Sequence, residues 1–422
     1  GVREAAAITR EARTEAHLGV LRAHYLRHVH GESREVFDPL NTRVEQFEEE
    51  RKGIEGQIAT TPVMKERTEP RPAYILKRGQ YDARGEEVAR STPSMLPPMK
   101  DGLPRDRLGL ARWLVDPNHP LTARVTVNRF WQQLFGVGLV ETSEDFGNQG
   151  ERPSHPELLD WLATSFIADG WRVKALQKQI IMSSTYCQCA ADPGTRGEGD
   201  PQNRLMARGP RFRLDAETLR DQALALSGLL VERIGGPSVK PPQPAGLWYA
   251  VGYTSSNTAR FKADEGAEKV HRRALYTFLK RTSPPPQMST FDAPSREECC
   301  VRRERTNTPL QALLLMNDPQ YVETAAALAG RIVREGGASD EDRAEFGLSL
   351  VLCRPPSKLD VADVIDLLLA QKIEYEGNPL AARQLLSVRG PSEMTDGEAV
   401  ELASWMLVAN LLLNLDEVVV KG

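Results

Sequence analysis

The chain has 422 residues, enough for two to three domains at the usual roughly 100–200 residues each. Hydrophobic residues make up 40% and charged residues 27%, so the sequence can bury a core and lacks the composition of a disordered polymer. The net charge of −4 argues against a general nucleic-acid binder, and no apolar run reaches the roughly 18–20 residues of a membrane-spanning helix.

The first part of the chain, residues 1–66, has helical periodicity with an interruption at Gly31. Its content of Ala, Glu, Arg and Leu predicts two helices packed as a hairpin or stalk. The sequence begins at Gly1 without a charged-then-apolar leader. We therefore expect any signal peptide to lie upstream of it or to have been removed.

Three histidines in this part, His17, His24 and His28, are spaced by seven and four residues and can share one helix face. Such a face can ligate a metal ion or bind haem without a covalent bond. More often it is a solvated or packing face, and no cysteine or carboxylate at ligand spacing accompanies it. The sequence therefore favours no metal here, with these histidines as the candidates if one binds.

Residues 67–104 contain more Pro, Gly and Arg and predict a connector with short strands, one of them at 73–77. Residues 105–422 predict one large helical domain. Its clearest helix spans 121–135, because Pro120 stands before it and Gly136 directly after it.

More helices follow in this domain. Ser154 and Glu157 fit the S-x-x-E capping box of a helix that we expect to stop at Gly170. Helical periodicity also predicts helices at 173–183 and 215–226.

The second half of the domain begins with an irregular stretch and then becomes helical. Residues 232–271 are rich in Gly, Pro and Ser and predict a long surface loop, and 274–278 have the pattern of a strand. Pro309 and Pro319 each open a helix. Residues 331–422 predict acidic helices, since 9 basic and 16 acidic side chains give a net charge of −7. The fold class is thus mainly α, a multi-helical globular domain with a few short strands and an N-terminal helical hairpin.

One loop, residues 144–155, concentrates acidic, amide and glycine residues before a capped helix. Glu144 or Asp145 could form an acid–base pair with His155, because catalytic groups often lie on loops between rigid elements. The alternative is structural: the glycines shape the turn and Asp145 accepts backbone hydrogen bonds. The structural interpretation is favoured.

Arginines are clustered in three places. Candidate anion-binding residues, suited to bidentate contacts with sulfate, carboxylate or phosphate, are Arg124, Arg129, Arg211, Arg213, Arg302 and Arg303. Arg204, Arg208 and Arg305 belong to the same clusters. The alternative is an internal ion network, which is favoured because acidic residues are interleaved with the arginines.

The five cysteines include no C-x-x-C pair and no C-x-x-C-H haem attachment motif, so we expect no cofactor in this chain. Free thiols are the favoured interpretation. The alternative is a disulfide between one residue of the pair Cys187 and Cys189 and one residue of the pair Cys299 and Cys300.

Several strings occur together in a fixed order. Examples are PLTARVTVNRFW at 120–131, SHPELLDWL at 154–162, RFRLDAE at 211–217 and TPLQAL at 308–313. This set resembles the C-terminal PSD domain of planctomycete cytochrome-c-containing proteins, a domain of unknown function. The resemblance covers about residues 100–420.

Residues 1–66 resemble the tail of the domain that usually precedes it. One departure is Cys187-Gln-Cys189, where the resemblance leads us to expect an Arg-Gln-Ser-like run.

The resemblance implies an exported protein, periplasmic or at the cell surface, in which haem c can be carried on an upstream module. It supplies no reaction and no catalytic residue. Its expected partners are its own upstream domains or a cytochrome module, with an anionic polysaccharide as a further candidate. From charge and hydropathy we expect no nucleic acid and no transmembrane helix.

The favoured function is a binding or scaffold domain that works beside an electron-transfer or surface-polymer module. One alternative is an enzyme on anionic or polysaccharide substrates, with an acid–base pair and an arginine clamp. The other is metal or haem binding by the N-terminal histidines. Whether the chain is an enzyme stays open at this point.

Overall fold

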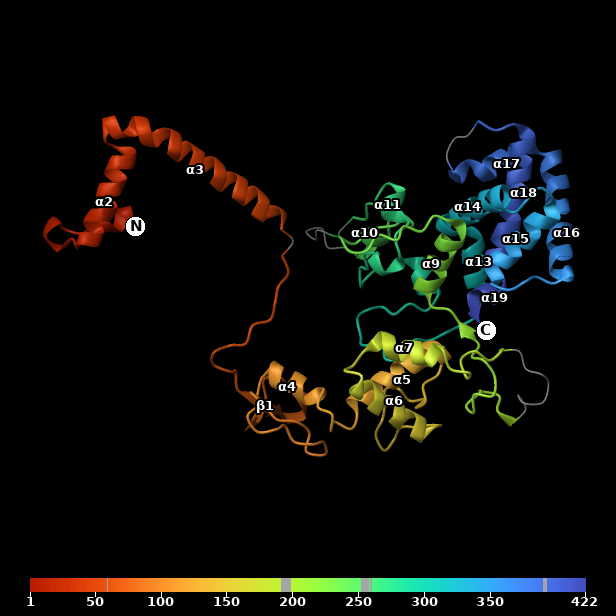
Figure 1. The fold of residues 1–422 in the computed structure, drawn as a ribbon, viewed down its shortest axis with the longest axis horizontal. Helices are drawn as coiled ribbons and strands as arrows, with labels where there is room; N and C mark the ends of the chain where they lie inside the picture. The colour runs from red at the N-terminus through yellow and green to blue at the C-terminus, as the bar shows by residue number, and fades with distance from the viewer. Residues whose placement is uncertain (59, 191–198, 252–257, 259, 390–392) are drawn as a thin grey trace. The chain divides into compact units, whose positions relative to one another are not determined.

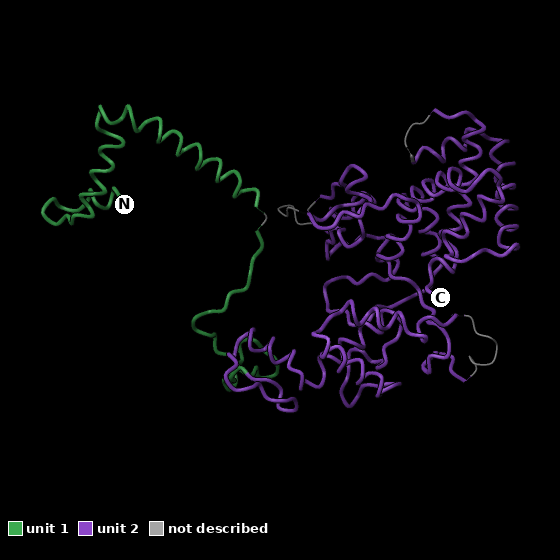
Figure 2. The backbone as a smooth tube through the Cα atoms, viewed as in Figure 1, with its two compact units in different colours: residues 1–90 green, residues 91–422 purple. Residues whose placement is uncertain are grey.

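The computed structural model describes residues 1–58, 60–190, 199–251, 258, 260–389 and 393–422. They form two compact units, residues 1–90 and 91–422 (Figure 2). The mainly α fold class is confirmed, because helices predominate and the described strands form two small two-stranded antiparallel sheets (Figure 1). The finer division at residues 66 and 104 stays a prediction.

Unit 1 contains helices followed by a β-hairpin. Its elements are α1 (Val2–Ala7), η1 (Arg10–Ala12), α2 (Glu15–His28), α3 (Gly31–Gln57), β1 (Ala73–Leu76), η2 (Lys77–Gly79) and β2 (Arg84–Val88). The predicted strand at 73–77 is β1, which pairs with β2. Arg78 and Gly79 turn the chain between them with φ angles of 51° and 74°.

The two long helices of unit 1, predicted to pack as a hairpin or stalk, form an open corner in which they do not lie side by side. The hydrogen bonds between them join the end of α2 to the first turns of α3: Ser33 Oγ donates to the Leu26 carbonyl (2.7 Å), and Asn41 Nδ2 donates to the Arg27 carbonyl (3.3 Å). Beyond the corner, α3 leads away from α2 (Figure 1). Among the described residues of this unit only Ala5 is buried, so packing does not hold the helices side by side.

Unit 2 begins with the short helix α4 (Arg107–Leu114). A helical lobe with its own apolar core follows, formed by α5 (Thr122–Phe135), α6 (Pro156–Ala168) and α7 (Val173–Ile181). One core cluster draws Val127 and Trp131 from α5, Leu162 and Phe166 from α6 and Ile180 from α7. The predicted helices of this region are present, and Gly136 and Gly170 follow α5 and α6 with positive φ as their positions require.

Gly136 supports a first prediction, because its φ is +83° and an added Cβ would lie 2.7 Å from Cδ1 of Phe212. Gly228, which ends a helix with φ +77°, has nothing within 4 Å of an added Cβ and is the matched control. We expect Gly136→Ala to lower the free energy of unfolding by about 3 kcal/mol and Gly228→Ala by about 1 kcal/mol. Urea denaturation measures both, and equal losses would mean that the Phe212 ring moves aside freely.

The capping box predicted at Ser154 and Glu157 is not formed. The helix α6 starts one residue later, with His155 at the N-cap position and Pro156 as its first residue, and no side chain caps it. Ser154 Oγ instead donates to the Leu139 carbonyl (3.4 Å), because the chain before α6 runs back against the 139–143 turn. Proline at the first helical position supplies the helix start without a cap.

The rest of unit 2 is a larger helical lobe. Its elements are β3 (Phe212–Arg213), α9 (Ala216–Ser227), α10 (Leu247–Val251), α11 (Ala267–Val270), η3 (Ala274–Tyr276), α12 (Pro286–Thr290), α13 (Pro309–Asn317), α14 (Pro319–Glu335), α15 (Asp340–Leu352), α16 (Lys358–Gly377), α17 (Pro379–Leu386), η4 (Ser387–Arg389), α18 (Asp396–Leu413), α19 (Asp416–Val419) and β4 (Val420–Lys421).

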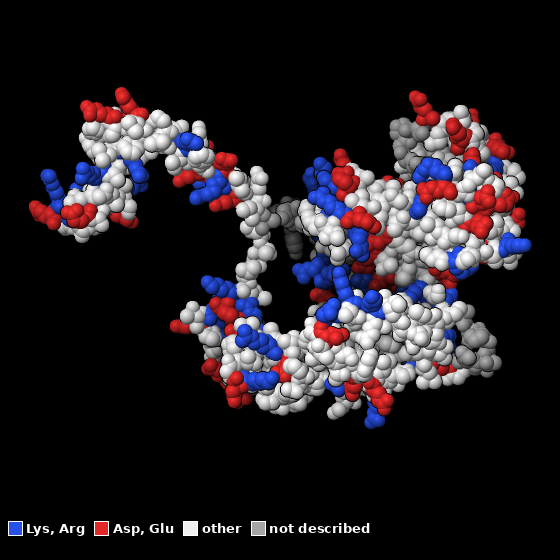
Figure 3. Space-filling model, in the orientation of Figure 1, with Lys and Arg blue, Asp and Glu red and all other residues white. Residues whose placement is uncertain are grey.

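Helix α18 forms the centre of this lobe and lies among α14 to α17 (Figure 1). After Glu401 its residues are almost all apolar and mostly buried, and even Ser404 and Asn410 are buried in it. Ser404 Oγ donates to the Val400 carbonyl (2.7 Å), which satisfies the hydroxyl inside the core. On the viewed face, acidic side chains are spread over the C-terminal helices (Figure 3), as the net charge of this region predicts.

Two predictions for the middle of the chain are wrong. The stretch 232–271 is not only a surface loop: its described part contains α10 and α11, and Trp248 is 1% exposed against the rings of Phe261 and Phe278. Residues 274–278, predicted as a strand, instead form the 3-10 turn η3 followed by an isolated parallel β-bridge between Thr277 and Val239. The Ala274 amide donates to Asp221 Oδ1 (2.6 Å), so the start of this segment turns and only its end is extended.

A short strand pair connects the middle of unit 2 to residues 420–421. Strand β3 pairs with β4 through the register Phe212 with Lys421 and Arg213 with Val420. Two-residue strands have no detectable sequence pattern, so this pairing was not predicted. It brings residues near 212 beside residues near 420. No helix in the described parts of the chain is long and apolar enough to cross a membrane.

Candidate anion-binding cavity

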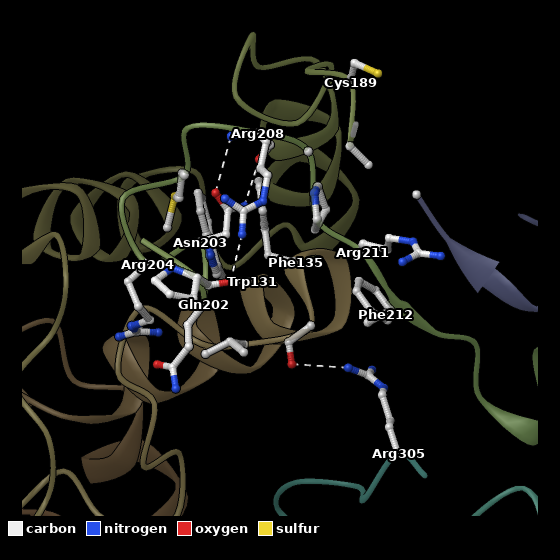
Figure 4. A pocket seen from close by; sticks show the side chains of 18 of the residues that line it. Trp131, Phe135, Cys189, Gln202, Asn203, Arg204, Arg208, Arg211, Phe212 and Arg305 are labelled. Carbon is white, nitrogen blue, oxygen red and sulfur yellow. Dashed lines mark hydrogen bonds between the residues drawn. The ribbon is translucent and has the colours of Figure 1, made fainter. Parts of the chain in front are cut away.

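A cavity of about 1090 Å³ lies in unit 2 beside the end of α5 and the β3–β4 pair (Figure 4). Its described lining includes five arginine and three aromatic side chains. The arginines are Arg204, Arg208, Arg211, Arg305 and Arg354, and the aromatic residues are Trp131, Phe135 and Phe212. Among these described lining residues the only acidic side chain is Glu417. We call this site the arginine cavity.

Backbone carbonyl groups hold Arg204 and Arg208 in place. Arg204 donates from Nη1 to the Gly138 carbonyl (3.0 Å) and from Nη2 to the Leu139 carbonyl (3.2 Å). Arg208 donates to the carbonyls of Asp200 (3.2 Å) and Pro201 (2.8 Å). Carbonyl oxygens are neutral acceptors, so these bonds orient each guanidinium. Carboxylates also lie near both groups: Glu141 Oε2 is 3.9 Å from Arg204 Nε, and the Asp200 carboxylate interacts with the charges of Arg204 and Arg208.

The segment that carries these two arginines is itself shaped by Asp200. Its carboxylate accepts from the Leu205 amide (2.7 Å) and the Arg204 amide (2.8 Å). The hydrogen bond from Leu205, followed by that from Arg204 and the charges of Arg208 and Arg204, lowers the pKa of Asp200 below its ordinary value. Asp200 is therefore ionised at neutral pH, and the turn that presents the arginines is set before any ligand arrives.

Arg305 approaches the cavity from a different segment. It donates to the Gly136 carbonyl (3.2 Å), and its guanidinium lies 4.3 Å from the centre of the Phe212 ring. Its Nη2 is 3.8 Å from Asp215 Oδ1, a loose ion pair. Arg305 thus stacks on one face of Phe212 and connects the end of α5 to the strand β3.

Lys421 holds strand β4 against the end of α5 and the Tyr186 ring, beside the cavity. Its ammonium donates to the Leu134 carbonyl (2.7 Å) and lies 3.7 Å from the centre of the Tyr186 ring. Burial lowers the pKa of Lys421 to about 8, so the group remains mostly protonated at pH 7. A charged lysine in this position suits the cation–π contact and fixes β4 beside the cavity.

The opposite part of the lining carries paired charges. Arg354 binds Glu417 with two hydrogen bonds of 2.9 and 2.8 Å, and Arg211 forms an ion pair with Asp416. The Arg211 side chain is 62% exposed, and that of Asp416 is 55% exposed. An exposed pair of this kind contributes little energy, so a ligand carboxylate or sulfate can compete for Arg211.

Of the six arginines predicted to bind an anion, Arg211 is the one that lines this cavity. Arg124 instead pairs with Asp160 (2.6 Å), and Arg302 lies 3.7 Å from Glu144. Arg129 is exposed on α5 and has no hydrogen bond or ion pair with any described residue. The internal network expected around Arg129 is therefore not formed there.

Arg213 and Arg303 belong to an internal polar network. Arg213 donates to Asn307 Oδ1 (3.1 Å) and packs over the Phe291 ring, and burial lowers its pKa. Arg303 binds both carboxylate oxygens of Glu217 at 2.6 and 3.1 Å. For these two residues the sequence-based preference for a network agrees with the contacts.

Glu217 supports a prediction about pH. Burial raises the pKa of Glu217, but the hydrogen bonds and charge of Arg303 outweigh burial and hold this pKa below 4.5. In the unfolded chain the group takes up its proton first, so its stabilising effect is complete above pH 4.5 and is lost as the pH falls further.

We expect Glu217→Gln to lower the free energy of unfolding by about 2 kcal/mol at pH 7. The difference in this free energy between the variant and the unmodified chain should become smaller below pH 4.5. Urea denaturation of both proteins from pH 7 to below pH 4.5 measures the free energies of unfolding. Glu151→Gln, a change at an exposed acid, is the control. If the difference in unfolding free energy between Glu217→Gln and the unmodified chain did not change with pH, the lowered pKa of Glu217 would be contradicted.

The three catalytic candidates, Glu144, Asp145 and His155, make contacts that do not bring them together. Glu144 is exposed near Arg302, and Asp145 Oδ1 accepts from the Gly147 amide (2.7 Å), as the structural interpretation predicts. His155 Nδ1 is 3.1 Å from Ser154 Oγ. The described contacts do not join Asp145 or Glu144 to His155, and none of the three lines the arginine cavity. A catalytic role for them stays an untested prediction.

The histidine face of α2 is partly assembled. The rings of His24 and His28 lie 4.8 Å apart, whereas His17 Nδ1 bonds to Thr14 at the start of the helix. The described residues contain no group of three or more His, Cys, Asp or Glu side chains that could hold a metal ion. Binding of metal or haem at this face stays untested.

The cysteines are exposed. Cys187, Cys299, Cys300 and Cys353 are free thiols, and Cys189 lines the arginine cavity. With Cys299 and Cys300 both free, the described structure contains no disulfide between the two predicted pairs. An oxidised form that joins them stays a prediction.

Sequence reasoning missed two components of the cavity. Arg354 and Glu417 come from distant helical segments, and the sequence contains no local signal that places them beside Arg204. Arg204, Arg208 and Arg305 were noticed as members of arginine clusters. Their position in one cavity depends on the β3–β4 pairing, which the sequence does not reveal.

Comparison with known proteins gives one match. The family model described as PSD1, protein of unknown function (DUF1553), matches residues 106–368. No curated protein and no solved structure matched the chain. The matched range includes α5 to α7, the arginine segment 200–212 and Arg305.

Proposed function

We propose that this chain, which belongs to the PSD1 family of proteins of unknown function, is a binding domain that holds anionic groups in the arginine cavity. The observation that carries the proposal is the charge of the lining. Five arginines and one glutamate face a cavity of about 1090 Å³, and backbone carbonyls orient several of the guanidinium groups in advance. Fixed guanidinium groups favour carboxylate, sulfate or phosphate because little side-chain entropy is lost on binding.

Binding is favoured over catalysis by the contacts of the candidate acids and base. Asp145 shapes a turn, Glu144 lies near Arg302, and His155 bonds to its neighbour Ser154. Each of these contacts gives the side chain a structural role outside the cavity.

The setting of the domain is a further part of this proposal. The resemblance to domains of exported cytochrome-c-containing proteins supports a position outside the cytoplasm, beside an electron-transfer or surface-polymer module. In that setting the domain would be a scaffold that holds an anionic polymer near its partner module. Fractionation of cells that make the full-length protein tests the location.

The binding proposal is tested by thermal unfolding at constant ionic strength. Sodium galacturonate is the probe, and galactose is the neutral control of matched shape. We expect the Tm to rise with galacturonate and to saturate, because a ligand that binds the folded state alone stabilises it by mass action. Galactose should have no such effect.

Two variants locate the effect. Arg211→Ala should weaken the response to galacturonate, whereas Arg129→Ala removes the same charge from an exposed position outside the cavity and should leave the response unchanged. A Tm that does not respond to galacturonate, sulfate or phosphate would contradict the proposal. An equal loss in both variants would show a general charge effect and no site.

A further inference from the structure

Resting on the proposed function, we infer that the ligand of the arginine cavity is an extended acidic oligosaccharide, with carboxylate or sulfate groups on successive sugars, and not a single small anion. The inference depends on the size of the cavity, on how its charges are spread and on the state of its aromatic rings.

The first argument is size. Cavities that enclose drug-sized ligands measure about 300–1000 Å³. The arginine cavity, at about 1090 Å³, is slightly larger than this range. A lone sulfate or carboxylate would fill a small fraction of it and would leave most of the lining in contact with water. The volume therefore suits several linked units.

The second argument is the separation of the positive charges. Arg204 and Arg211 lie on opposite sides of the Trp131 and Phe135 rings, with Arg208 between them (Figure 4). Arg204 is held by the Gly138 and Leu139 carbonyls, whereas Arg211 pairs with Asp416 of α19. Because different elements anchor them, these guanidinium groups reach the cavity from different sides. They match a ligand whose charges are repeated along a chain.

The third argument separates sugars from nucleic acids. A single-stranded nucleic acid is bound by exposed aromatic rings on which its bases stack. Here Trp131 is 4% exposed and stacks on Phe135 with ring centres 4.1 Å apart, and Arg305 covers a face of Phe212. These ring faces therefore already pack against other groups of the protein. The surface between the arginines offers the Gln202 amide and the backbone of 136–138, which suit hydroxyl groups.

The test is calorimetric titration of the complete 422-residue chain. The probes are hexagalacturonate, a heparin-derived hexasaccharide, monomeric galacturonate, uncharged maltohexaose, a linear hexaphosphate and a single-stranded hexanucleotide. We expect hexagalacturonate or the sulfated hexasaccharide to bind at least about tenfold more tightly than monomeric galacturonate, because linked anions bind successive guanidinium groups cooperatively. Which of the two binds better identifies carboxylate or sulfate.

Variants connect the affinity to the cavity. Arg211→Ala, or Arg211→Gln should the alanine variant unfold, is expected to lower hexasaccharide affinity at least about fivefold, and Arg129→Ala is expected to leave it unchanged. Equal affinity for monomer and hexamers would overturn the inference and leave the proposed function standing. Tighter binding of hexaphosphate or the hexanucleotide would overturn the ligand class. Binding of maltohexaose as tight as that of the acidic hexamers, or no binding of any anion, would overturn both proposals.

Discussion

Replacing Arg220 with alanine is expected to lower the free energy of unfolding by about 3–5 kcal/mol, because this variant leaves buried acceptors unpaired. The Arg220 side chain is 2% exposed. It donates to Gln320 Oε1, the Arg272 carbonyl and the Val270 carbonyl, each at 2.7 Å. These bonds join α9 to the start of α14 and to the end of the irregular stretch, so their loss affects three segments together.

Arg273 is the matched control. Like Arg220, it lies near a carboxylate oxygen of Asp221, but its side chain is 59% exposed. We expect Arg273→Ala to cost less than about 1 kcal/mol. Urea denaturation of the two variants at pH 7 gives the comparison. A loss below about 1 kcal/mol for Arg220→Ala would mean that water replaces the guanidinium and that the site is more open than its burial indicates.

The second large effect is expected for Asn128→Asp. Asn128 is 0% exposed and fixes the turn beside the arginine cavity. Its Nδ2 donates to the Val140 carbonyl (3.0 Å) and Ser143 Oγ (3.0 Å), and its Oδ1 accepts from the Val140 amide (2.8 Å). Aspartate has the same shape, but it would place a buried negative oxygen against the Val140 carbonyl. We expect a loss of about 3–5 kcal/mol at pH 7.

The sign of its pH dependence follows from this environment. Burial without a cation raises the pKa of the introduced carboxyl in the folded state, so the folded chain binds the proton more readily than the unfolded chain. The variant should therefore regain stability as the pH falls toward the ordinary carboxyl pKa of about 4. Asn148→Asp, at an exposed loop position, is the control. Stability of Asn128→Asp that does not change between pH 7 and pH 5 would contradict the expected burial.

The sequence predicts those elements that local chemistry determines. Gly136 and Gly228 end α5 and α9 with positive φ, and Pro309 and Pro319 open α13 and α14, as their patterns indicate. These signals act within a few residues and need no tertiary information.

Predictions fail where distant partners decide the structure. The apolar pattern at 274–278 indicates a strand, but the bond from the Ala274 amide to Asp221 of α9 favours a turn. The sequence did not predict the arginine cavity for the same reason. Arg211 was identified as an anion-binding candidate from its cluster, yet its neighbours Arg305, Arg354 and Glu417 are supplied by segments that only the folded chain brings together.

The pairing of β3 with β4 has a consequence for biosynthesis. Arg211 and Asp416 are separated by 205 positions, and Lys421 reaches back 287 positions to the Leu134 carbonyl. A ribosome therefore releases Arg204 to Phe212 long before it has made the residues that complete the cavity wall. Contacts with such long separation form late and slowly. Until residue 421 has been made, the nascent chain carries these arginines without strand β4 and its contact with the end of α5, so the proposed anion site is incomplete until β3 can pair with β4.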